Sequence, residues 1–164
     1  MNKKILFVCM GNICRSPAAE GIAKKLMEKK GLNGSIEIDS AGTLGYHEGE
    51  KPDARMIKHA SKRGYVLDSQ ARQFNPKKDF EHFDYIVTMD DDNYSEITSL
   101  DGKNEFRNKV FKMVSFGKNV NVNEVPDPYY SGSQGFEIVL DILEDSIEGL
   151  FSKVEDDIRR ENKS

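Results

Sequence analysis

Residues 5–17 read ILFVCMGNICRSP and contain three successive structural signals. The continuous apolar run at residues 5–8 is typical of a strand that is buried on both faces. Ser16 and Pro17 are residue types favoured at the N-cap and the first position of a helix. The segment therefore predicts a buried strand, a loop at residues 9–15 and a helix with Ser16 as its N-cap.

The rest of the chain continues this alternation of strands and helices. Further strands are expected at residues 36–39, 85–88 and 109–113. Helices are expected at residues 16–30, 52–63, 90–97 and 136–158, and the last has apolar residues at steps of three and four on one face. The pattern predicts a single three-layer α/β domain spanning residues 1–164, in which helices flank a four-stranded, parallel, twisted sheet.

Composition excludes several classes of protein. The 164 residues include 24 Lys and Arg against 28 Asp and Glu, a net charge of −4 that argues against a nucleic-acid partner. The longest apolar run, residues 5–10, is too short to span a membrane, and no membrane partner is expected. Two cysteines make no disulfide scaffold, and with no export signal they favour the cytoplasm, with secretion by a non-classical route as the alternative.

The loop at residues 9–15 is where chemistry is expected, because ligands of parallel α/β folds bind at the carboxyl ends of the strands. Gly11 and Asn12 tolerate the positive φ that a loop with inward-facing amides requires. The following helix adds the positive end of its dipole, and Arg15 can present a planar fork to two oxygens. Together these features predict a cradle for a phosphate-sized anion.

Cys9 is the first residue of this loop, and the cradle would favour its thiolate. A thiolate under a bound phosphate can attack phosphorus in line, and Ser16 can form a hydrogen bond with the sulfur. Cys14 has a simpler interpretation as a small buried apolar residue. No metal or other cofactor is expected, because there is no second cysteine pair and the three histidines lack ligand spacing. A nucleotide-binding P-loop is excluded because no Gly-Lys-Ser/Thr follows.

Residues 8–20, VCMGNICRSPAAE, resemble the signature of low-molecular-weight protein tyrosine phosphatases. The resemblance continues at residues 40–43, 71–73, 83–86, 89–90 and 125–129, and so covers nearly the whole chain. It implies a flavodoxin-like fold whose phosphate-binding loop includes Met10, Ile13 and Cys14. It also implies phosphotyrosine proteins or small aryl phosphates as substrates, and a monomer or weak dimer.

Asp127 is the candidate general acid and base. It lies between Pro126 and Pro128, which stiffen the backbone, although this spacing alone is also that of a common turn. The resemblance places the acid of the family at this position. It also makes Tyr129 and Tyr130 a wall of the aromatic pocket, with Tyr46 opposite, where many bacterial relatives have Trp.

The resemblance further implies residues that support the loop. Asn12 would take a left-handed conformation and form a hydrogen bond with Ser40, while Arg72 would form a structural ion pair. Ser69 stands where relatives often have His, so stabilisation of the loop is expected to differ here. The acidic run at residues 90–92 lacks the ligand spacing of a calcium loop and is interpreted as a helix N-terminus.

Three alternatives to a tyrosine phosphatase stay open at the level of sequence. An arsenate reductase of the thioredoxin-coupled type would need further cysteines after Cys14, and none follows. A protein-arginine phosphatase of the same family is the second alternative. Relatives that prefer phosphoarginine have Thr at the position of Ile13, whereas the apolar Ile13, with Tyr129, suits an aromatic ring better. A non-catalytic phosphopeptide-binding module would gain nothing evident from Cys9, Arg15 and Asp127 together.

Overall fold

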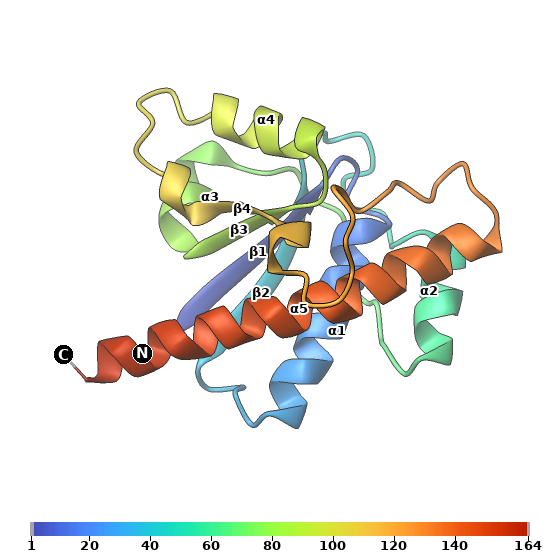
Figure 1. Cartoon of the computed structure of the whole chain (residues 1–164). Coiled ribbons are helices and arrows are strands. Elements are labelled where there is room, and N and C mark those ends of the chain that lie inside the picture. Colours follow the sequence, from blue (N-terminus) through green and yellow to red (C-terminus); the bar gives the residue numbers. More distant parts are fainter. Residues whose placement is uncertain (1, 164) are drawn as a thin grey trace.

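The computed structural model describes residues 2–163, and the predicted α/β class is confirmed (Figure 1). The strands are β1 (Lys3–Cys9), β2 (Ile36–Gly42), β3 (Tyr85–Thr88) and β4 (Val110–Lys112). The helices are α1 (Arg15–Lys29), α2 (Ala54–Lys62), α3 (Pro76–His82), α4 (Asp91–Ser99) and α5 (Ser133–Asn162), with 3-10 turns η1 (Arg107–Lys109) and η2 (Met113–Phe116).

All strand pairs of the sheet are parallel, and their order is β2-β1-β3-β4. β1 is therefore central, with Ile5 opposite Ile38 of β2 and Tyr85 of β3. After β1 the chain forms β2 on one side of it, and later forms β3 on the other side. The loop after β1 consequently lies at the point where the strand order reverses, where ligands bind in such folds.

Both faces of β1 are buried, as its apolar run predicts. Ile5 and Phe7 belong to the core formed with α1 and α5. Leu6 and Val8 pack on the other face, with aromatic residues that include Phe80 of α3. Figure 1 shows the resulting layers, with α1 and α5 on one side of the sheet and α3 and α4 on the other.

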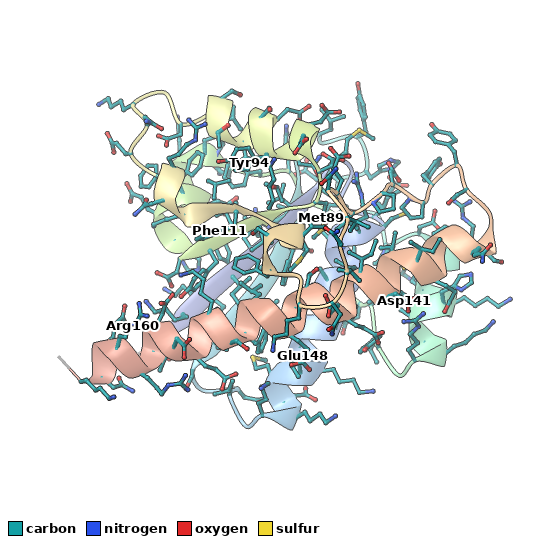
Figure 2. The ribbon with its side chains drawn as sticks, viewed as in Figure 1. Met89, Tyr94, Phe111, Asp141, Glu148 and Arg160 are labelled. Atoms are coloured by element: carbon teal, nitrogen blue, oxygen red, sulfur yellow. The ribbon has the colours of Figure 1, made fainter. Side chains whose placement is uncertain are left out.

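The long helix α5 is amphipathic in the predicted manner. Leu143 and Ile147 are fully buried against the sheet. Asp141, Glu148 and Arg160, which Figure 2 labels, lie on its exposed side. No helix within residues 2–163 combines the length and the apolar character needed to cross a bilayer.

Two local expectations need revision. α1 begins at Arg15 with Cys14 as N-cap and no side-chain cap, so the prediction of Ser16 as N-cap is wrong. The Ser16 hydroxyl instead faces the sulfur of Cys9. Helix α3 was not predicted, although Asn75 caps it by accepting a hydrogen bond from the Lys77 amide.

Candidate active site

The loop between β1 and α1 contains one residue with a left-handed backbone. Asn12 has φ 58°, as expected, whereas Gly11 does not have a positive φ. Position 11 lies close to the neighbouring loop, because a Cβ atom there would lie 3.1 Å from His47 Cδ2. Gly11 therefore permits the loop at residues 43–50 to approach closely.

The side chain of Asn12 holds this conformation in place. Its Nδ2 donates to Ser16 Oγ at 2.8 Å and to Ser40 Oγ at 3.0 Å. Its Oδ1 accepts from the backbone N–H of Arg72 at 3.0 Å. These three bonds connect the loop to α1, to β2 and to the segment before α3, and they offset the cost of a left-handed non-glycine residue.

Cys9 ends the central strand and is only 3% exposed. Its Sγ lies 3.0 Å from Ser16 Oγ, and Ser16 is fully buried in the first turn of α1. A hydroxyl at this distance can donate to a thiolate. The sulfur also lies below the N-terminus of α1, which favours negative charge.

Arg15 is a buried cation, 3% exposed. Its Nη1 donates to Asp90 Oδ2 at 2.7 Å and to the Val125 carbonyl at 3.0 Å, and its Nη2 lies 3.8 Å from Asp127 Oδ2. Burial acts to lower the pKa of Arg15, but the charge of Cys9 and the bond to Asp90 outweigh it and raise the pKa. The guanidinium is therefore held charged at the base of the site.

Asp127 lies on the loop before α5, and its side chain is 37% exposed. Its Oδ1 accepts from the Tyr129 N–H at 3.0 Å, a turn in which the side chain replaces a backbone acceptor. The other oxygen stays directed toward Arg15. The carboxyl group is thus both oriented and accessible to a ligand, as a proton donor must be.

Cys9, Arg15 and Asp127 line one pocket of about 280 Å³. The remaining lining residues come from the loop (Met10, Gly11, Ile13, Cys14), from residues 46 and 47 (Tyr46, His47) and from the segment after Asp127 (Tyr129, Tyr130). A polar base with apolar and aromatic walls is typical of small-molecule sites.

The aromatic walls are open to solvent at the pocket mouth. Tyr129 and Tyr130 meet edge to face, with ring centroids 4.9 Å apart, and Tyr130 is 94% exposed. The Arg55 guanidinium lies 5.2 Å from the centroid of the Tyr129 ring. Tyr46, on the other loop, is 84% exposed. Flat rings on two sides leave a slot that suits a flat ring of a ligand.

Cys14 also lines the pocket, but it differs chemically from Cys9. It is 4% exposed, and burial, together with the charge of Asp53, strongly raises the pKa of its thiol. Cys14 therefore stays a neutral thiol at physiological pH, consistent with its interpretation as a small buried apolar residue.

The supporting residues lie behind the loop and do not line the pocket. Asn12, Ser16 and Ser40 are buried, and Arg72 forms ion pairs with Asp39 at 3.1 Å and Asp79 at 2.9 Å. The ion pair expected of Arg72 is present. Within residues 2–163, no three side chains of His, Cys, Asp or Glu come together as a possible metal site.

Three polar residues around the site were not predicted in these roles. Asp90 was interpreted only as part of a helix N-terminus, yet it binds Arg15 from 75 positions along the chain. Glu20 accepts from Ser40 Oγ at 2.5 Å, and His47 covers Gly11. Glu20 lies within the signature stretch, so its presence there was the only available signal.

Comparisons with known proteins show the family that the chain resembles. The family model of low molecular weight phosphotyrosine protein phosphatase matches residues 4–161. YfkJ of Bacillus subtilis, named a low molecular weight protein-tyrosine-phosphatase, is 36% identical over 153 residues, which cover 92% of this chain and 95% of its own. A crystal structure of a protein tyrosine phosphatase from Entamoeba histolytica is 48% identical with a TM-score of 0.91, covering 94% of this chain and 98% of that one. The structure of a Drosophila arginine phosphatase is 31% identical with a TM-score of 0.84, covering 92% and 96%.

Proposed function

The chain belongs to the low molecular weight phosphotyrosine protein phosphatase family, and from this we propose how its residues hydrolyse phosphotyrosine. In the first step the Cys9 thiolate attacks phosphorus, and the bond from phosphorus to the tyrosine oxygen breaks. Asp127 gives its proton to the departing phenolate, so that tyrosine leaves as a neutral phenol. The products of this step are a phosphocysteine and an Asp127 carboxylate.

The second step reverses the role of Asp127. Its carboxylate takes a proton from water while the water oxygen attacks phosphorus, and the bond from sulfur to phosphorus breaks. Inorganic phosphate and the Cys9 thiolate result. Ser16, 3.0 Å from the sulfur, stabilises the thiolate as the leaving group.

Arg15 and the loop bind the phosphate through both steps. Because Arg15 is already held by Asp90 and Val125, its remaining N–H groups are oriented before the substrate arrives. The backbone amides of residues 10–15 and the start of α1 complete the anion site. Tyr46, Tyr129 and Tyr130 contact the phenyl ring.

The observation that supports these roles best is the convergence of Cys9, Arg15 and Asp127 in one pocket. Cys9 and Asp127 are 118 positions apart in the sequence. A phosphopeptide-binding module needs neither a nucleophile nor an acid, so it does not explain why these two side chains share a pocket. An arsenate reductase of the thioredoxin-coupled type is disfavoured because the chain has only two cysteines. The apolar Ile13 in the pocket wall favours phosphotyrosine over phosphoarginine.

The test compares phosphotyrosine peptide, phosphoarginine and arsenate as substrates, in the presence of EDTA. We expect metal-independent release of phosphate from phosphotyrosine, and no turnover by Cys9→Ser. Asp127→Asn should slow phosphotyrosine hydrolysis by about 100-fold or more, because general acid catalysis contributes roughly 10²–10⁴. The activated ester p-nitrophenyl phosphate should lose less, since its leaving group needs a proton less.

Glu124→Gln on the same loop is the control for Asp127→Asn. The proposal fails if Cys9→Ser keeps its turnover, or if phosphoarginine or arsenate is preferred over phosphotyrosine.

Two free cysteines, one of them the nucleophile, also support the proposal of a cytoplasmic location, where thiols stay reduced.

A further inference from the structure

A continuous chain of hydrogen bonds runs from Cys9 to a buried carboxylate. Cys9 Sγ lies 3.0 Å from Ser16 Oγ, which accepts from Asn12 Nδ2 at 2.8 Å. The second N–H of Asn12 Nδ2 donates to Ser40 Oγ at 3.0 Å. Ser40 Oγ in turn donates to Glu20 Oε1 at 2.5 Å. All five residues are at most 5% exposed, so water does not compete along the chain.

The carboxylate and the Asn12 amide together set the directions of these bonds, because Asn12 Oδ1 accepts from the Arg72 N–H and its Nδ2 therefore donates to both serines. A carboxylate only accepts, so the single proton of the Ser40 hydroxyl is directed to Glu20. Ser40 Oγ must then accept from Asn12, whose other N–H goes to Ser16 Oγ. The single proton of Ser16 then has two acceptors, Cys9 Sγ at 3.0 Å and the more distant Ala41 carbonyl at 3.4 Å. If the Ser40 hydroxyl pointed its proton toward Asn12 instead of Glu20, two donors would face each other, Ser40 Oγ–H and Asn12 Nδ2–H.

Glu20 depends on Lys24 for its only positively charged partner within residues 2–163. Lys24 follows Glu20 by one turn of α1, and its Nζ donates to Glu20 Oε2 at 2.6 Å. The side chain of Glu20 is 6% exposed, and a carboxylate buried to this extent needs such a partner. Burial acts to lower the pKa of Lys24, but the bond and charge of Glu20 outweigh it and raise the pKa.

No other side chain is in a position to replace this lysine. Ser69 lines the same surface hollow as Glu20 and Lys24, but it has no hydrogen bond within residues 2–163. Lys25, the next residue, extends to the carbonyl groups of Arg63 and Gly64 instead. Lys24 is thus the outermost residue of the series of hydrogen bonds that ends at Cys9 Sγ.

We propose that Lys24 is a positioning residue of the phosphatase reaction. By holding Glu20 as an acceptor for Ser40, it keeps Ser40 Oγ as the acceptor for Asn12, and so holds Asn12 and Ser16 in position at the Cys9 thiolate. This proposal rests on the phosphatase function proposed above. It adds a surface residue, outside the pocket, that acts on the sulfur through four buried side chains.

The first test measures phosphotyrosine hydrolysis by Lys24→Met, Lys24→Arg and the matched control Lys25→Met. Lys24→Met should lower kcat by about threefold to tenfold, the value of one weakened hydrogen bond to a charged group. KM should change by less than about twofold, because the chain ends on the sulfur and not on the phosphate. Lys24→Arg should restore most of kcat, and Lys25→Met should match the unaltered protein. Glu20→Gln removes the charge at constant shape and should give the same loss as Lys24→Met.

The second test measures alkylation of Cys9 by iodoacetate at a fixed pH and needs no phosphorylated substrate. The rate should fall in Lys24→Met and recover in Lys24→Arg. If the unaltered protein does not hydrolyse phosphotyrosine, the proposed function fails while this measurement still decides the role of Lys24. Unchanged kcat and alkylation in Lys24→Met would overturn the role. An equal loss in Lys25→Met, or no recovery in Lys24→Arg, would reduce it to a general effect on α1.

Discussion

The two oxygens of the Asp90 carboxylate have different partners. Oδ1 accepts from the Asn93 N–H at 2.7 Å and caps α4, while Oδ2 accepts from Arg15 Nη1 at 2.7 Å. One residue therefore both begins a helix and orients the cation of the active site. Its neighbours in the acidic run do neither, since Asp91 pairs with Lys112 and Asp92 is exposed.

Replacing Asp90 by Asn should separate these two tasks. Asparagine is as good an N-cap as aspartate, so the melting temperature should change little. The charge beside Arg15 is lost, and kcat/KM for phosphotyrosine should fall about tenfold, as for one charge-assisted hydrogen bond. The control is Asp92→Asn. Equal kcat/KM values for the two variants would show that Asp90 acts only as a helix cap.

Single residues of the site were predictable where their partners are close in sequence. Cys9, Asn12, Arg15 and Ser16 form one short loop, and its residue types suffice to indicate an anion site. Asp90 contacts the site through space, and nothing in the acidic run distinguishes it from a solvated helix start. The pairing of Lys24 with Glu20 looks like any i,i+4 ion pair until Ser40 is seen behind it.

Among the helices, α5 shows a glycine in an unusual position. Gly149 lies in the interior of this 30-residue helix, where glycine costs about 1 kcal/mol relative to alanine. A Cβ atom at position 149 would lie 1.8 Å from the Phe116 carbonyl oxygen. The close approach brings η2 against α5 and positions the segment that follows, whose backbone N–H groups at residues 118–120 donate to Asp145.

Gly149→Ala should therefore destabilise the protein, although helix propensity alone predicts a gain. We expect a loss of about 1–3 kcal/mol in the free energy of unfolding, the usual cost of overpacking. Urea denaturation followed by circular dichroism measures it. Ser152→Ala, on an exposed position of the same helix, should be neutral or slightly stabilising. A stabilised Gly149→Ala would mean that η2 moves away at no cost.

Elements with a strong apolar pattern were predicted, and α4, which buries only Asn93 and Ile97, was predicted without one, but α3 was not. α1, α5 and the buried strands have enough apolar residues for their periodicity to be read. α3 has only seven residues and buries only Asp79 and Phe80. Two adjacent buried residues give no helical periodicity that could be recognised in the sequence. The strand predicted at residues 109–113 is shortened to three residues because 3-10 turns occupy both of its ends.

Several carboxylates across the molecule have a lowered pKa in the folded protein because of cationic or amide partners. Arg63 and then His59 of α2 lower the pKa of Glu137 in α5, and Arg55 lowers that of Asp53. Burial opposes the shift of Asp145, but the amides of residues 118–120 prevail and lower its pKa as well. These groups are charged in the folded protein at pH values where the unfolded chain has begun to take up protons.

Stability should consequently fall on acidification. A lowered folded pKa contributes stability above the unfolded value of about 4, and this contribution is lost as the pH falls through the folded pKa. The free energy of unfolding should be level from about pH 7 to 5 and decline below about pH 4.5. Asp145→Asn should flatten part of this decline, and the exposed Glu148→Gln should not. A decline of the same slope in Asp145→Asn would contradict the assignment.

The opposite sign applies at alkaline pH. Burial and a hydrogen bond to Asp157 at 2.5 Å raise the pKa of Tyr85, and burial with Glu144 raises that of Tyr65. The unfolded chain loses these protons near pH 10 while the folded protein retains them, so stability should decline above about pH 10. Tyr85→Phe should reduce the slope of that decline, whereas Tyr46→Phe, at an exposed position, should leave it unchanged. Thermal melts between pH 8 and 11 provide the measurement.

Lys3 at the start of β1 is ion-paired with Glu161 near the end of α5, with 2.5 Å between Nζ and Oε1. Cys9 is at the other end of the same strand, about 20 Å away at roughly 3.3 Å per residue. A fluorophore or a linker to a solid support, attached beside Lys3 or Glu161, therefore extends from the side of the molecule opposite to the pocket. The protein can be immobilised through this side with its pocket still facing a substrate as large as a folded protein.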